Sequence, residues 1–146
     1  MSKWSKWHVV VLVVVMSALI GCSGSSSATT DRAQKMAAMA MMPDAVRSAA
    51  SVTQEAYQFV LANPEMLKGI PCYCGCGGMG HRSNYSCYVQ SDRGSGMPVF
   101  DTHALGCSIC VDITQDAMRL SKQGKSLQEI RAYVHDTYAR FGPSNM

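Results

Sequence analysis

Residues 70–81 read Ile-Pro-Cys-Tyr-Cys-Gly-Cys-Gly-Gly-Met-Gly-His, and this stretch decides how the rest of the chain must be arranged. Three cysteines alternate with single residues, and the glycines between and after them allow the backbone to curl. If the stretch is locally extended, Cys72, Cys74 and Cys76 project from the same side, roughly 7 Å apart. We therefore expect an irregular loop whose sulfurs converge on one site.

Three more cysteines follow this loop: Cys87, Cys107 and Cys110. The last two are spaced so that both face one way at the start of a predicted helix. The free amides and the dipole at a helix start favour thiolate, which is the form that binds metal. His81 and His103 lie close in sequence to the two cysteine groups and are candidate nitrogen ligands, with His103 the weaker one. The candidate metal ligands are thus Cys72, Cys74, Cys76, His81, Cys87, His103, Cys107 and Cys110.

Helical patterns precede the cysteine-rich stretch. Residues 31–42 are rich in alanine and methionine, which favours a helix, and we expect the methionines to pack rather than to bind metal. Apolar residues recur at helical spacing across residues 44–62. Asn63-Pro64 is predicted to end that helix, because proline disfavours the α conformation in the residue before it.

Two more helices are predicted after the cysteine-rich stretch. The first runs from about residue 106 to residue 123, with Gly124 as its C-terminal cap. The next begins at Ser126-Leu-Gln-Glu129, a capping box, and turns Ile130, Val134, Tyr138 and Phe141 inward. Short strands are expected at residues 86–90 and 99–102. The predicted fold is mainly α: a small domain of about three helices with an irregular Cys/Gly-rich insert and two short strands.

The N-terminal segment is typical of an export signal. Lys3 and Lys6 precede an apolar run at residues 9–20, which falls short of the roughly 20 apolar residues that a membrane-spanning helix needs. Leu19-Ile20-Gly21-Cys22 resembles the bacterial lipobox, in which the cysteine is acylated and becomes the new N-terminus. Residues 23–30 are rich in serine and suit a flexible tether.

These features predict the domain organisation and the location. Residues 1–21 are a signal peptide, residues 22–30 a lipidated cysteine and tether, and residues 31–146 a single Cys-rich helical metal-binding domain. The lipid on Cys22 would anchor this domain to the cell membrane, facing the periplasm or the cell exterior. Removing Lys3 and Lys6 lowers the net charge from +3 to +1, so no basic surface points to nucleic acid.

A binding protein is expected rather than an enzyme, since no Ser-His-Asp order, phosphate loop or carboxylate pair is present. Cu(I) is the favoured ion: it is soft, favours thiolates, and several cuprous ions bridged by six thiolates would use every sulfur. Zinc is the alternative metal, although a single ion takes four ligands and leaves sulfurs over. A metal-transport or metal-receiving protein is the expected partner.

Two other functions stay open. Three disulfides would also account for six cysteines outside the cytosol, and the domain would then be a stapled interaction module. Alternatively, the Cys107/Cys110 pair resembles a thioredoxin-type arrangement in outline, which would make the protein a thiol–disulfide oxidoreductase. A preceding βαβ pattern is lacking, however, and this scheme gives the other four cysteines no role.

The cysteine pattern also resembles that of a known family. Residues 70–78, with His81, Asn84-Tyr85, Cys87-Tyr88 and the run Phe-Asp-Thr-His-Ala-Leu-Gly-Cys-Ser-Ile-Cys-Val-Asp-Ile at 100–113, resemble the PCYCGC-motif lipoprotein family. The similarity extends from about the first long helix to the Gly142-Pro143 tail. The resemblance implies export, a shared cysteine site and a link to metal handling, without naming a reaction. Its signature positions here are Cys72, Cys74, Cys76, His81, Cys87, His103, Cys107 and Cys110.

Overall fold

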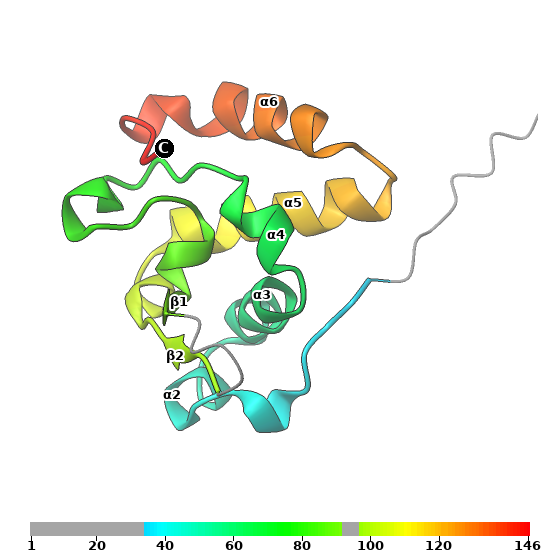
Figure 1. The fold of residues 1–146 in the computed structure, drawn as a ribbon, viewed down its shortest axis with the longest axis vertical. Helices are drawn as coiled ribbons and strands as arrows, with labels where there is room; N and C mark the ends of the chain where they lie inside the picture. Colours follow the sequence, from blue (N-terminus) through cyan, green and yellow to red (C-terminus); the bar gives the residue numbers. More distant parts are fainter. Residues whose placement is uncertain (1–33, 92–96) are drawn as a thin grey trace, which may run out of the picture.

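The structure is a computed structural model that describes residues 34–91 and 97–146 (Figure 1). The expected signal peptide (residues 1–21), the lipidated Cys22 and the tether lie outside the described residues. Within the described ranges, every helix is too short or too polar to cross a membrane.

The described part of the chain contains five α-helices and one two-stranded antiparallel sheet. They are α2 (Asp44–Arg47), α3 (Ser51–Ala62), α4 (Pro64–Lys68), α5 (Ser108–Lys122), α6 (Leu127–Tyr138), β1 (Val89–Ser91) and β2 (Val99–Phe100). In the sheet, Val89 pairs with Phe100 and Ser91 with Val99, with an irregularity between the two pairs. The predicted mainly α fold with a small sheet is confirmed.

Helix α5 is the centre of the packing, with α3 against one side and α6 against the other (Figure 1). Its buried face carries Ile113, Ala117 and Leu120, a spacing that repeats with the helical period. Ile130, Val134 and Tyr138 of α6 are buried, as predicted. The predicted inward position of Phe141 is wrong: its side chain is 49% exposed, because α6 ends at Tyr138 and a 3-10 helix (Ala139–Phe141) follows.

The helix predicted over residues 44–62 is divided into two. Helix α2 ends at Arg47, and Ala50 is extended, with φ −60° and ψ 147°. The break leaves backbone carbonyls without helical partners. The side-chain amide of Gln54 supplies the missing hydrogen-bond partners. It donates to the carbonyl oxygens of Arg47 at 2.8 Å and Ala49 at 2.9 Å. Gln54 therefore stabilises the break between α2 and α3. This break and the additional helix α4 raise the number of α-helices in the described residues from the predicted three to five.

The alanine- and methionine-rich segment is also less helical than predicted. Within its described residues only Met39–Met41 is helical, as a short 3-10 helix. Ala37 donates its N–H to the carbonyl of Gln58 in α3, and the Gln58 side chain donates back to the carbonyl of Ala37. Met42 inserts into the core and is 1% exposed. Tertiary contacts with α3 thus override helix propensity.

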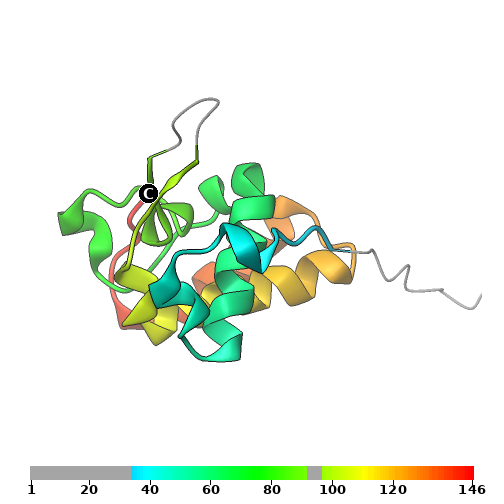
Figure 2. The ribbon, with the colours of Figure 1, turned by 90° about the horizontal axis from the view of Figure 1, so that it is seen from below.

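The cysteine-rich loop and the C-terminus lie together at one end of the molecule (Figure 2). A buried network of hydrogen bonds ties this end to α5. Asn84, which is 0% exposed, donates to the carbonyl of Cys110 at 3.2 Å and accepts from the Thr114 hydroxyl at 2.7 Å. The Tyr88 hydroxyl donates to the same carbonyl at 2.8 Å. The network fixes the first turn of α5 against the loop.

We predict that Asn84→Ala lowers the free energy of unfolding by about 2 to 3 kcal/mol, because it leaves buried polar groups without partners. Urea unfolding of the reduced, metal-free chain measures this. Ser126→Ala is the comparison, since it removes the capping box of α6 and should cost about 1 kcal/mol. A loss for Asn84→Ala no larger than that for Ser126→Ala would contradict the role of the network.

Candidate metal centre

Three sulfurs form a nearly equilateral triangle at the cysteine-rich end. The Sγ–Sγ distances are 3.5 Å for Cys72–Cys74, 3.5 Å for Cys74–Cys110 and 3.6 Å for Cys72–Cys110. We call these three residues the thiolate triangle. A disulfide bond is about 2.05 Å long, so these sulfurs are in contact but not bonded. The centre of a triangle with 3.5 Å sides lies about 2.0 Å from each corner, close to the 2.3 Å of a metal–thiolate bond.

Cys107 extends the triangle toward solvent. It is the N-cap residue of α5, and its Sγ lies 3.1 Å from that of Cys110. His103 Nε2 lies 3.5 Å from Cys74 Sγ, and the ligand atoms of Cys74, His103, Cys107 and Cys110 all lie within 4.8 Å of one another. Cys74, His103 and Cys107 are half-buried, whereas Cys110 is fully buried. This edge is therefore accessible to an incoming ion.

A second part of the cluster combines sulfur and nitrogen, and its two sulfurs also lie within 4.8 Å of those of Cys72 and Cys74. The Sγ atoms of Cys76 and Cys87 are 3.6 Å apart, and the ligand atoms of Cys76, His81, Cys87 and His103 lie within 4.8 Å of one another. We call these four residues the mixed group. Together, the triangle, Cys107 and the mixed group bring together all eight residues that the sequence predicts as ligands. The cluster could hold a metal ion.

Glycine conformation shapes the loop after Cys74. Gly75 and Gly80 have φ values of +82° and +88°, which side-chain-bearing residues rarely adopt. They flank a 3-10 helix (Cys76–Met79), so the chain turns sharply after Cys74. The stretch is thus not extended throughout, so the roughly 7 Å spacing of an extended chain does not apply. The sulfurs converge as expected, with Cys72 and Cys74 Sγ 3.5 Å apart.

Burial and hydrogen bonds between thiols shift the cysteine pKa values in opposite directions within the metal-free cluster. Thiol hydrogen bonds from Cys110 and Cys87 lower the pKa of Cys72 to about 2. The pKa of Cys110 is raised, because its thiol donates to Cys72, and burial raises the pKa of Cys74 and Cys76. In the metal-free chain this hydrogen bond to Cys72 raises the pKa of Cys110 although the residue lies in the first turn of α5.

Two residues that support the cluster were not predicted. Asn145 accepts from the Cys72 N–H at 2.7 Å, donates its own N–H to the Cys72 carbonyl at 3.1 Å, and lies 3.5 Å from the Cys76 sulfur. No local pattern could reveal it, since it is 73 residues from Cys72. Asp101 lies 3.4 Å from His81 Nε2. Asp101 stands two residues before His103 in the sequence, and this closeness to a predicted ligand was the signal that could have identified it.

The family comparison covers most of the chain. The family model described as a protein of unknown function with PCYCGC motif matches residues 11–143. The chain belongs to this family. The motif itself, residues 71–76, supplies two corners of the thiolate triangle and one member of the mixed group, and all eight cluster residues fall inside the matched range. No curated protein and no solved structure matches the chain.

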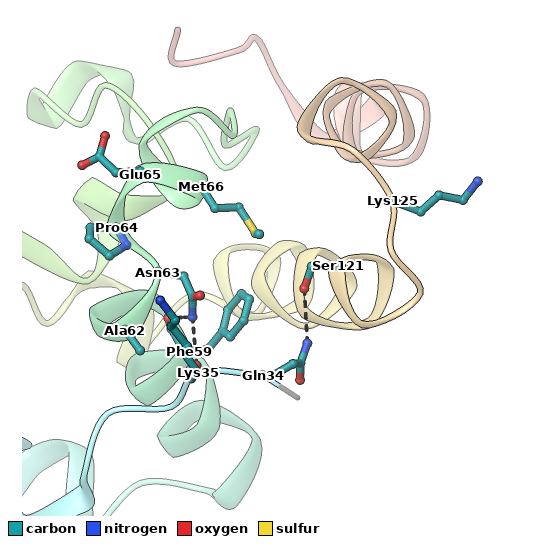
Figure 3. A pocket seen from close by; sticks show the side chains of 10 residues that line it. All are labelled: Gln34, Lys35, Phe59, Ala62, Asn63, Pro64, Glu65, Met66, Ser121 and Lys125. Atoms are coloured by element: carbon teal, nitrogen blue, oxygen red, sulfur yellow. Dashed lines mark hydrogen bonds between the residues drawn. The ribbon is translucent and has the colours of Figure 1, made fainter. Parts of the chain in front are cut away.

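A pocket of about 400 Å³ lies elsewhere, between the N-terminal segment, the α3–α4 junction and the end of α5 (Figure 3). Gln34 spans one side and donates to the Ser121 hydroxyl at 3.2 Å. Lys35, Glu65 and Lys125 also line it, but none of the eight cluster residues does. The pocket and the cysteine chemistry are therefore separate.

We predict that metal binding at the thiolate triangle releases at least one proton per ion, since burial raises the pKa of Cys74 and a hydrogen bond to Cys72 raises that of Cys110. Raised pKa values mean that these thiols hold their protons at neutral pH. Acid therefore opposes binding, and apparent affinity should fall as pH falls. Calorimetry in two buffers of different protonation enthalpy counts the protons, and a heat that does not depend on the buffer would contradict the prediction.

Proposed function

We propose that this protein is an exported, lipid-anchored protein that binds Cu(I) through its thiolate triangle, for sequestration, storage or delivery. The observation that carries the proposal is the triangle itself: three sulfurs 3.5–3.6 Å apart around a point at nearly bonding distance from each. Cu(I) is soft and selects thiolates. It also accepts a three-coordinate site, whereas structural zinc takes four ligands in a tetrahedron.

The cysteines of the cluster differ in how deeply they are buried, and this difference suits a site that exchanges its ion. Cys72 and Cys110 are 0% exposed, so an ion bound to them is shielded from water and oxidants. Cys74 and Cys107 are half-buried, so a partner's sulfur could reach the ion from that edge. A metal-transport or metal-receiving protein in the same envelope is the partner that this arrangement fits. The sequence features of residues 1–30 support the export and the anchor.

A thiol–disulfide reaction at Cys107 and Cys110 is the second candidate function. It is favoured by the 3.1 Å approach of the two sulfurs, the shortest sulfur–sulfur contact among the described residues. The half-buried Cys107 would react first and the buried Cys110 would close the disulfide. Such a disulfide would use the sulfur of Cys110, which is one corner of the thiolate triangle. A molecule with this disulfide could therefore not bind an ion at the complete triangle.

We predict that the reduced chain holds Cu(I) against a competing chelator and that Cys72→Ser or Cys110→Ser weakens the affinity for the first ion at least about 100-fold, because each removes a ligand. Cys22→Ser is the matched control, since it removes a thiol that is none of the eight predicted ligands, and it should leave the affinity unchanged. Competition titration under anaerobic conditions gives these affinities.

Two outcomes would count against copper binding. The proposal fails if the reduced wild-type chain yields all its Cu(I) to the chelator. Reduction of insulin by the wild-type chain, abolished by Cys107→Ser, would support the redox candidate instead.

We predict that Cys22→Ala abolishes incorporation of radioactive palmitate and releases the protein from the membrane fraction, since it removes the acylated thiol. Cys107→Ser leaves a thiol at Cys22 and should retain both the label and the membrane location. Metabolic labelling followed by fractionation tests this. Label that persists in Cys22→Ala would contradict the assignment of the anchor.

A further inference from the structure

The mixed group has the geometry of a second metal site. A tetrahedral ion with 2.3 Å bonds to sulfur holds two sulfurs about 3.8 Å apart. The Cys76 and Cys87 sulfurs are already 3.6 Å apart, and nitrogens of His81 and His103 complete a set of four ligand atoms within 4.8 Å. The two imidazole rings are perpendicular, with centroids 5.1 Å apart, so they can approach one ion without stacking.

A buried atom without a partner points to a ligand at this place. His81 is only 7% exposed, and its Nδ1 has no hydrogen-bond partner among residues 34–91 and 97–146. A buried polar atom in this state is costly and uncommon in native proteins. The other ring nitrogen, Nε2, lies 3.4 Å from Asp101 Oδ2. Histidines that bind metals commonly use this pairing, with one nitrogen on the ion and the other donating to a carboxylate.

Asp101 holds both histidines of the mixed group. Its Oδ2 faces His81, and its Oδ1 accepts from the backbone N–H of His103 at 2.7 Å. Asp101 is itself fixed, because its carbonyl accepts from the Tyr57 hydroxyl at 2.7 Å and its N–H donates to the Tyr88 carbonyl at 2.8 Å. One carboxylate on a rigid segment therefore sets the position of two ligands.

We propose that the mixed group binds a divalent ion, Zn²⁺, through Cys76, Cys87, His81 and His103, with Asp101 as a positioning residue. Two thiolates balance the charge of a divalent ion, and imidazole with thiolate is a ligand set that zinc favours. Assigning His103 to this ion leaves the thiolate triangle and Cys107 as an all-sulfur set. Each of the eight residues then has one assignment. The inference extends the proposed function, because it rests on the cluster being a metal centre.

Zinc-edge X-ray absorption on the reduced full chain with one equivalent of Zn²⁺ tests the ligand set. We expect a shell of two sulfurs and two nitrogens. A shell of four sulfurs would overturn the second site, because zinc would then occupy the cysteines alone. This measurement uses the wild-type chain and does not depend on the folding of a variant.

Asp101→Asn tests the positioning role. We expect it to weaken zinc binding by about 10- to 100-fold and to disorder the nitrogen shell, since the amide cannot serve as the carboxylate partner of His81. The first Cu(I) equivalent should bind as in the wild type. Asp112→Asn is the matched control, because Asp112 is exposed on α5, and should change neither metal. Unchanged zinc affinity in Asp101→Asn would overturn the positioning role.

The two proposals fail in distinguishable ways. Loss of zinc binding with Cu(I) binding intact removes only the second site. A chain that binds neither ion removes the metal function altogether.

Discussion

Cys110 lies in the first turn of α5, buried against the loop that carries Cys72 and Cys74, and the rest of the structure depends on this contact. On the far side of the turn, its carbonyl accepts from Asn84 and Tyr88, so backbone and sulfur are both held. Helix α5 is in turn packed between α3 and α6. The helical core therefore holds the first turn of α5 against the cysteine-rich loop. This contact sets the distances between the sulfurs of Cys72, Cys74 and Cys110.

Six cysteines gather at one end of the molecule, and four of them are buried. Thiol donors lower the pKa of Cys72, while burial raises the pKa of Cys74 and Cys76. A cation at the centre would stabilise several thiolates at once and release their protons. His81, with its Nδ1 unpartnered among the described residues, is a further candidate ligand in the mixed group. Both parts of the cluster could therefore hold a cation.

The sequence was a good guide to regular structure and to the identity of the clustered residues. Periodicity and the capping box at Ser126 located α5 and α6, because those signals are local. The break before α3 was not predictable, since it depends on Gln54 reaching back to two carbonyls. Nor could the triangle be drawn from spacing, because Cys72 and Cys110 are 38 residues apart and only the folded core brings them together. Asn145 could not be predicted for the same reason, since it is 73 residues from Cys72 in the sequence.

The central claim is that the cysteine cluster is a metal centre and not a disulfide scaffold or a redox pair. The most direct measurement is elemental analysis combined with thiol counting, on the protein purified anaerobically from the cells that produce it. The account predicts bound copper, with six cysteines that resist alkylation until the metal is removed and react after denaturation. A protein that carries no metal and no free thiols would contradict it.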